Sequence, residues 1–374
     1  MKVTRRVFTA LAAAAGFTQA NGALILMTSV PGPKDSQPVP PPYEGTESHV
    51  GPNQRSSERF HRISLITAPS NLGLRPNEDG TQQGAWEAPQ ALMQAGLAIT
   101  LRPVDSYFLP RPRYEFDAQP GTRIRNGQSI RDFSVDLAAY VAHEIVLGQF
   151  PVVIGGDCSV LLGCLYGSRL AGGRGVVHID GHSDFFHPGN YDTKARLGSA
   201  AGMDLALVSG RGEAILTEWP EISGPLARDE EILQMGERDA ERPDFRKYYG
   251  DILDTKITQW TVQRMLRDGI EPTVREALSI LEQRKLDKVW LHIDLDVLDE
   301  KVMPAVDSPG KPGLDFQQLS SLVNVFCASR RIVGADFAIY DPGRDPQRRY
   351  ARPLVECIST GITGSPPDKL AAAH

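Results

Sequence analysis

Short apolar runs alternate with longer amphipathic stretches along most of the chain after residue 60. The apolar runs cover residues 63–68, 151–154, 175–180, 231–235, 288–294 and 331–335. They have the length of buried strands, whereas residues 134–147, 159–170 and 271–284 have the apolar spacing of helices. Strands that alternate with helices indicate βαβ units and a parallel sheet. The pattern therefore predicts an α/β protein.

The first 60 residues lack this pattern. Residues 1–23 carry Arg5 and Arg6 ahead of an Ala-rich, mildly apolar run, which is similar to a twin-arginine export signal. Residues 24–60 are rich in Pro, Gly, Ser and Glu and predict a linker or arm. We therefore expect a periplasmic or secreted protein. If residues 1–23 are only a basic tail before an ordinary helix, the protein stays in the cytoplasm.

Composition and charge narrow the classes of partner. The chain has 40 Lys and Arg against 46 Asp and Glu, and its basic residues are scattered, so nucleic acid is not an expected partner. No apolar run reaches the roughly 18 residues needed to span a bilayer, so a membrane is not expected either. The four cysteines lie far apart without a C-x-x-C pair, which indicates separate thiols.

Polar residues of one chemical kind stand where two of the apolar runs end. Asp180, His182 and Asp184 follow one another at intervals of two, and so do Asp294 and Asp296. In extended chain such residues point to one side, and the carboxyl ends of parallel strands meet at one edge. Four carboxylates there repel one another unless cations neutralise them, and two divalent ions carry the required charge. Taken alone, the first motif is as typical of a polar turn, and the second is weaker still.

A third motif makes the pattern specific. Residues 155–159 read Gly-Gly-Asp-Cys-Ser, between an apolar run and a helix, where glycines permit a tight turn. Gly-Gly-Asp-Cys-Ser, Asp-Gly-His-Ser-Asp and Asp-Leu-Asp-Val-Leu-Asp, in this order, resemble the metal-binding signatures of the ureohydrolase superfamily of arginases, agmatinases and formiminoglutamases. The segments 68–73 and 303–309 also fit. The resemblance implies one three-layer αβα domain with a mostly parallel sheet, over residues 61–368, and assembly into homotrimers or homohexamers.

The resemblance also implies a site and a reaction. The family holds a hydroxide between two Mn²⁺ ions, and the hydroxide attacks a guanidinium carbon and releases urea and an amine. We therefore expect hydrolysis of a C–N bond in a small guanidino or amidino compound, with Asp184 among the catalytic residues. One ion would be bound by Cys158, Asp180, Asp184 and Asp296, and the other by Asp180, His182, Asp294 and Asp296.

The ligand Cys158 departs from the family pattern, because arginases and agmatinases usually carry His at this position. As a thiolate ligand it would favour softer ions such as Zn, Ni or Fe over Mn. A buried structural cysteine is the other interpretation, and the sequence leaves both open.

Two further departures concern the substrate. Ile339 stands where the family usually places a Glu that anchors the guanidinium, which leaves Asp336 and Asp341 as candidate substrate-binding residues. Asp239, at another strand end, is a third candidate, although a solvated turn is the simpler interpretation. Residues 191–204 contain no equivalent of the family's acid/base His, so His187 is the nearest candidate for that catalytic role.

These departures make arginine and agmatine less expected as substrates. They leave two functions open: an enzyme for another amidino, guanidino or formimidoyl compound, and a catalytically silent subunit that assembles with an active paralogue. The retained carboxylates favour the enzyme. His178 and His292 each precede a metal-site Asp by two residues, and we expect them to orient ligands by hydrogen bonds. Tyr191, Lys194 and Arg196 are expected in a loop over the mouth of the site.

Overall fold

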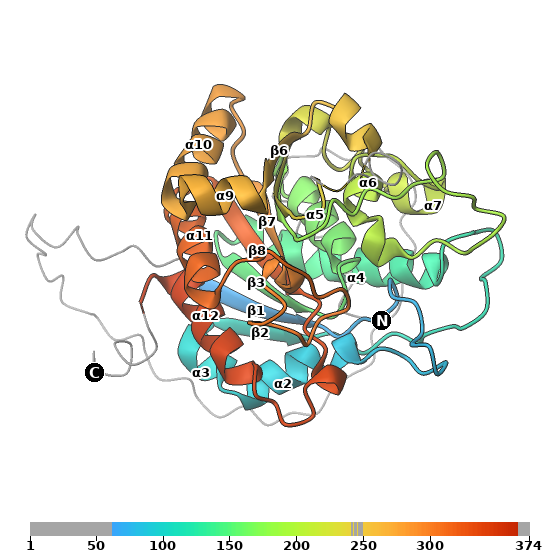
Figure 1. Ribbon diagram of the computed structural model, residues 1–374, viewed down its shortest axis with the longest axis horizontal. Coiled ribbons are helices and arrows are strands. Elements are labelled where there is room, and N and C mark those ends of the chain that lie inside the picture. The colour runs from blue at the N-terminus through green and yellow to red at the C-terminus, as the bar shows by residue number, and fades with distance from the viewer. Residues whose placement is uncertain (1–61, 241, 243–244, 246–249, 366–374) are drawn as a thin grey trace, which may run out of the picture. The chain divides into compact units, whose positions relative to one another are not determined.

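Eight strands form a single sheet in the order β2-β1-β3-β8-β7-β4-β5-β6, and each neighbouring pair is parallel (Figure 1). This computed structural model describes residues 62–365, apart from 241, 243–244 and 246–249. The strands are β1 (Ile63–Ala68), β2 (Asp105–Phe108), β3 (Phe150–Gly155), β4 (Val176–Ile179), β5 (Ile232–Glu237), β6 (Thr258–Thr261), β7 (Val289–Asp294) and β8 (Ile332–Ala338).

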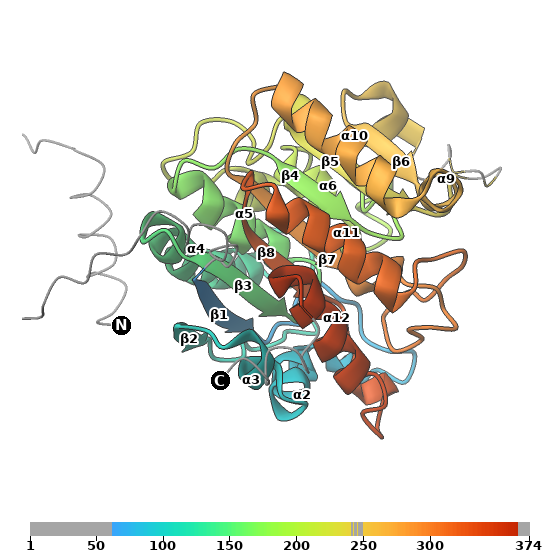
Figure 2. The same cartoon turned by 90° about the vertical axis from the view of Figure 1, so that its left-hand side faces the viewer.

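Helices cover both faces of the sheet (Figure 2). One face carries α4 (Gly127–Val146), α5 (Val160–Leu170), α6 (Asp204–Val208) and α7 (Ala214–Thr217). The other carries α2 (Ala88–Gln94), α3 (Leu97–Leu101), α9 (Val262–Asp268), α10 (Ile270–Gln283), α11 (Phe316–Ala328) and α12 (Ala351–Thr363). Single 3₁₀ turns lie between them: η1 (Gly84–Glu87), η2 (Ala200–Gly202), η3 (Asp229–Glu231), η4 (Gly250–Asp254), η5 (Leu295–Val297) and η6 (Pro342–Arg344).

The central strands are apolar on both sides because both sides are covered. In β3, Val152 and Ile154 pack into the core under α10, α11 and α12, while Val153 packs into the core under α4 and α5. Alternation along a strand therefore divides its residues between two cores. The same alternation sends His178 of β4 and His292 of β7 to the α5 side, together with Val176 and Trp290.

The architecture confirms the three-layer αβα fold with a parallel sheet. Each of the six apolar runs forms a strand, and the three helical stretches correspond to α4, α5 and α10. The two edge strands were not predicted, because β2 and β6 have only four residues each and are partly exposed. Within the described part of the chain, no helix combines the length and the apolar character needed to cross a membrane. The export signal and the arm lie outside the described residues.

Candidate metal centre

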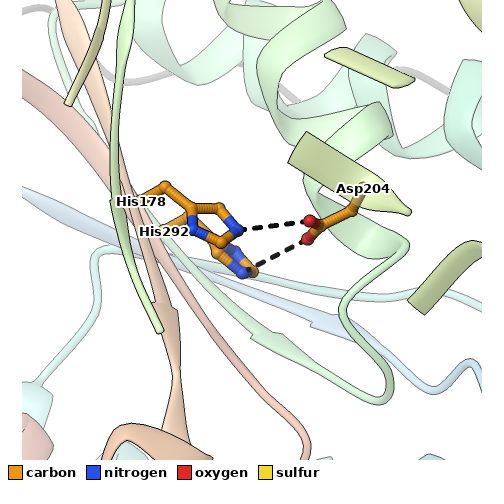
Figure 3. A group of neighbouring side chains, drawn as sticks. All are labelled: His178, Asp204 and His292. Carbon is orange, nitrogen blue, oxygen red and sulfur yellow. Dashed lines mark hydrogen bonds and ion pairs between the residues drawn. The ribbon is translucent and has the colours of Figure 1, made fainter. Parts of the chain in front are cut away.

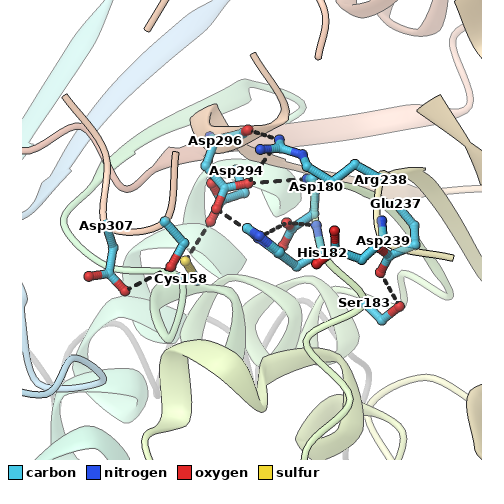
Figure 4. Close-up of polar contacts among 12 residues, drawn as sticks. Cys158, Asp180, His182, Ser183, Glu237, Arg238, Asp239, Asp294, Asp296 and Asp307 are labelled. Carbon is cyan, nitrogen blue, oxygen red and sulfur yellow. Dashed lines mark hydrogen bonds and ion pairs between the residues drawn. The ribbon is translucent and has the colours of Figure 1, made fainter. Parts of the chain in front are cut away.

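The site is built on β4 and β7, which are neighbours in the middle of the sheet. His178 pairs with His292 in the register of these strands, so the residues two positions further on, Asp180 and Asp294, reach the sheet edge side by side. Both carboxylates are buried, at 0% and 1% exposed. Figure 4 shows them facing the side chains of Cys158, His182 and Asp296. The strand register therefore brings together two of the four carboxylates that the sequence predicted.

The turn between β3 and α5 brings Cys158 to the same edge. Gly156 makes this turn possible, because a Cβ at this position would lie 1.7 Å from the carbonyl oxygen of Ser70. Asp157 fixes the turn by accepting hydrogen bonds from Ser70 Oγ at 3.0 Å and from the Ser159 amide at 2.9 Å. The Cys158 thiol then donates to Asp294 Oδ2, with 2.6 Å between the two atoms. The structure thus places Asp294 beside Cys158, whereas the sequence analysis had assigned Asp296 to the same ion.

His182 joins the cluster from the loop that follows β4. Its Nδ1 lies 2.9 Å from Asp296 Oδ2 and 3.7 Å from Asp180 Oδ1, and its backbone amide donates to Asp180 Oδ1 at 2.7 Å. His182, Asp180 and Asp296 offer ligand atoms that all lie within 4.8 Å of one another, as do Asp180, His292 and Asp294. Histidine nitrogen and carboxylate oxygen at these separations are the donors of a divalent transition-metal site.

Arg238, directly after β5, is a buried residue that contacts Asp296. Its side chain is 3% exposed, and its guanidinium donates to the backbone carbonyl of Asp296. Gly181 and Gly310 leave room for it, since a Cβ on either would lie 1.8 Å or 2.4 Å from a guanidinium nitrogen. The guanidinium thereby places a positive charge 3.8 Å from Asp296 Oδ1.

Burial and mutual repulsion shift the proton affinities of this cluster. Burial, reinforced by neighbouring carboxylates, raises the pKa of Asp184 and Asp294 well above its usual range. Burial also raises the pKa of Cys158 well above its usual range, and Asp294 adds to this shift. Asp296 behaves differently: burial opposes ionisation, but the charges of His182 and Arg238 outweigh it and lower its pKa. Burial and crowding therefore disfavour ionisation of Cys158, Asp184 and Asp294, and bound divalent cations would offset this cost.

A pocket of about 220 Å³ opens onto this edge. Of the residues predicted from the sequence, it is lined by Cys158, His182, Asp184, Asp239, Asp294 and Asp296, with Tyr191 and Arg196. Asp180 lies beneath it, fully buried. Arg75 and Phe186 are among the further lining residues and were not predicted from the sequence, whereas Asp307 and Ser308, which also line the pocket, belong to the predicted segment 303–309. Ile339 also lines the pocket, at the position where the family usually has Glu.

The backbone geometry after β4 differs from the prediction. The strand ends at Ile179, before the three polar residues, and Asp184 has a φ of +42°. The chain is therefore not extended there, and the spacing of two residues does not explain why the side chains converge. Asp184 still faces the pocket, because Asp tolerates the left-handed conformation better than most residues.

Three residues predicted at the site lie elsewhere. His187 Nε2 is 2.5 Å from Asp251 Oδ2, and His187 does not line the pocket. Asp336 is buried in β8, where it accepts hydrogen bonds from Trp290 Nε1 at 2.6 Å and His292 Nδ1 at 2.7 Å. Asp341 accepts hydrogen bonds from the amides of residues 84 and 343 beside a separate surface cavity. These local contacts engage their polar atoms, and none of the three side chains lines the pocket.

Asp204, the first residue of α6, was not predicted from the sequence. Its carboxylate is fully buried and lies between His178 and His292 (Figure 3). An acidic residue ahead of an apolar run is typical of an exposed helix start, so the local sequence gave no signal for this position.

Comparisons with known proteins identify relatives over most of the chain. The model of the Arginase family matches residues 61–360. Arginase of Bacillus caldovelox is 28% identical over 305 residues, covering 80% of this chain and 97% of that protein. Its native crystal structure superposes with a TM-score of 0.68 at 26% identity, covering 81% of this chain and 99% of the other. A formimidoylglutamase structure from Bacillus subtilis subsp. subtilis str. 168 shares the fold, with a TM-score of 0.61 at 18% identity, covering 81% of this chain and 86% of that one.

Proposed function

Because the chain belongs to the arginase family, we propose that it is a metal-dependent hydrolase that cleaves a C–N bond of a small guanidino or amidino compound. The observation that carries this proposal is the group of buried carboxylates, with His182 and Cys158, at the floor of the pocket. Relatives named arginase align with four-fifths of this chain and with nearly all of their own length. The similarity that supports the proposal therefore extends over nearly the whole of these enzymes.

Two divalent ions fit this donor set. Cys158, Asp180, Asp184 and Asp294 would hold one ion, and Asp180, His182 and Asp296 the other, with Asp180 shared between them. The fit rests on the raised pKa values of Asp184 and Asp294 and on the ligand atoms of Asp180, His182 and Asp296, which all lie within 4.8 Å of one another. When bound, such ions supply a water of lowered pKa and positive charge beside the reacting carbon. Mn is the family's metal, and a Cys158 thiolate would favour Zn, Ni or Fe.

The chain's own residues determine what the pocket accepts. Asp239 and Asp307 line it and present negative charge to a cationic guanidinium or amidinium group. Ile339 offers only an apolar surface on the pocket wall, so no carboxylate at this position pairs with a cationic substrate. Arg196 packs over the rings of Phe186 and Tyr191, at 5.2 Å and 5.1 Å, and places a positive charge at the pocket. We therefore propose a substrate other than arginine or agmatine.

The proposal is tested by substrate screening of the full-length protein after chelation and reloading with Mn, Zn, Ni or Fe. The panel contains arginine, agmatine, other guanidino compounds, amidines and a formimidoyl amino acid, with release of urea, ammonia or formamide as the readout. We expect turnover of at least one compound outside the arginine and agmatine pair. The matched control is Asp180→Asn, which should abolish turnover. Metal-loaded protein that is inactive toward the entire panel would contradict the proposal.

Among the described residues, no observation favours a catalytically silent subunit. Such a subunit would have no need for buried carboxylates that repel one another, and their retention is costly without cations.

A further inference from the structure

A second group of side chains with the chemistry of metal ligands lies deeper in the sheet than the site described above. His178 and His292 occupy paired positions on β4 and β7, two residues before Asp180 and Asp294, and their rings stack with centroids 4.9 Å apart. Asp204 reaches them from α6 (Figure 3), with Oδ1 3.2 Å from His178 Nε2 and Oδ2 3.5 Å from His292 Nε2. All three side chains are fully buried.

The donor atoms of this group face one another. His178, His292 and Asp204 each offer one ligand atom, and these atoms all lie within 4.8 Å of one another. Within the described chain, His292 Nε2 and Asp204 Oδ2 have no hydrogen-bond partner, although both are buried. Buried polar atoms without a partner are costly, and a cation between them would satisfy both. Asp180 Oδ2 is also unpartnered, 3.6 Å from His178 Nε2.

A hydrogen bond to Asp336 fixes the orientation of the His292 ring. Its Nδ1 donates to Asp336 Oδ2 at 2.7 Å, and Asp336 is in turn held by Trp290 Nε1 at 2.6 Å. A histidine that binds a metal usually donates its second ring nitrogen to a carboxylate in this way, which fixes the tautomer and aims the other nitrogen at the ion. In His292 that other nitrogen is Nε2, the atom that faces Asp204. The arrangement is therefore that of a ligand held in place by a second carboxylate.

We propose that His178, His292 and Asp204 bind a divalent cation, with Asp180 within reach as a fourth ligand that links this ion to the outer pair. The carboxylates of Asp204 and of Asp336, which is hydrogen-bonded to His292, together carry a charge of −2, which one divalent cation neutralises. Two nitrogen and two oxygen donors suit Zn²⁺. This inner ion would connect β4, β7 and α6 behind the reacting centre. The proposal does not depend on the substrate or on turnover.

Without a cation, the same residues would form a network in which a protonated His292 lies between Asp204 and Asp336. The two arrangements are distinguished by diffraction. The full chain is crystallised after loading with Zn²⁺, and anomalous difference maps are calculated at the zinc absorption edge. We expect a peak between the two imidazole rings, separate from the peaks beside Cys158 and His182. Peaks at the outer positions with none between His178 and His292 would overturn the proposal.

Metal content gives a second test that does not require crystals. Asp204→Asn keeps the shape of the side chain but removes its charge, and it should lower the zinc content by about one ion per chain. The matched control is Asp345→Asn, another buried aspartate, which is hydrogen-bonded to Tyr340 and belongs to no donor group. Equal zinc content in the two variants would refute the inner site. If Asp204→Asn does not fold, the anomalous map of the unaltered protein decides the question.

Discussion

At the scale of single residues, Cys158 has the largest influence on the outer pair of ions, which are the two ions proposed at the floor of the pocket. Its thiol is buried and donates to Asp294, and burial holds its pKa well above the usual range. A cation can bind the sulfur only as the proton leaves. Binding through Cys158 therefore carries the free-energy cost of deprotonating the thiol, which a neutral histidine ligand does not have. A thiolate also adds a negative charge that makes the bound ions weaker Lewis acids.

Replacing Cys158 therefore tests its role directly. Cys158→Ala should lower the metal content by about one ion per chain, and Cys158→His should restore it and shift the preference toward Mn. Metal content and turnover with each metal are the measurements. Cys164→Ala is the control, because Cys164 is equally buried in α5 but does not line the pocket. If Cys158→Ala keeps its full complement of ions and its activity, Cys158 is a packing residue.

Glu237, at the end of β5, makes stability depend on pH. Burial raises the pKa of Glu237 from 4.5 to about 7, against the hydrogen bonds from Ser183 and from the Asp239 amide. A carboxyl with a raised folded-state pKa contributes stability below about 4.5, and the contribution disappears as the pH rises through about 7.

Glu237→Gln removes this ionisation. Between pH 5 and pH 8 the variant should gain stability relative to the unaltered protein, by up to about 3 kcal/mol at 1.36 kcal/mol per pKa unit. Urea unfolding of the chelated protein at both pH values measures the difference. The control, Glu218→Gln, alters an exposed residue and should show no such trend. A pH-independent difference for Glu237→Gln would contradict the assignment.

At the scale of elements, the turn between β3 and α5 has the tightest packing at the site. Gly156→Ala would bring a methyl group to 1.7 Å from the Ser70 carbonyl oxygen, so the turn that carries Cys158 must shift. We expect a loss of about 3 kcal/mol in the free energy of unfolding, typical of overpacking, together with weaker metal binding. Gly202→Ala is the control, since its Cβ would meet only Phe186, at 3.7 Å. Unchanged stability and metal content in Gly156→Ala would show that the turn can relax.

At the scale of the whole molecule, we propose that residues 1–23 direct export by the twin-arginine route. This route carries folded proteins, which suits an enzyme that must acquire its metal before it leaves the cytoplasm. Replacing Arg5 and Arg6 with lysine should retain a fusion reporter in the cytoplasm, as measured by cell fractionation. If the reporter reaches the periplasm at an unchanged level, the signal is of another kind.

We also propose that the protein assembles into a homotrimer or homohexamer, with residues 24–60 contacting a neighbouring subunit. Deletion of these residues should then weaken assembly while leaving the fold of the catalytic unit intact. Sedimentation velocity at micromolar concentration measures the assembly state of both forms. A monomer in the full-length protein would exclude the proposal.

The sequence by itself determined the six inner strands of the sheet and most of the polar residues that gather at the pocket. The six central strands can be predicted because burial on both faces requires continuous apolar runs. Asp180 and Asp294 can be predicted because carboxylates at the ends of buried parallel strands indicate a ligand site. The short edge strands β2 and β6 lack this signal, since partial exposure relaxes their composition.

Only the tertiary structure decided which polar residues share a site. Asp204 joins His178 and His292 because the first residue of α6 lies beside their side chains, a contact that no local pattern records. The pairing of β7 with β8 brings Asp336 to His292, and the loop after β4 brings His187 to Asp251, so neither Asp336 nor His187 lines the pocket. Periodicity fixes the direction of a side chain relative to its own element. The identity of its partner depends on how elements distant in the sequence pack together.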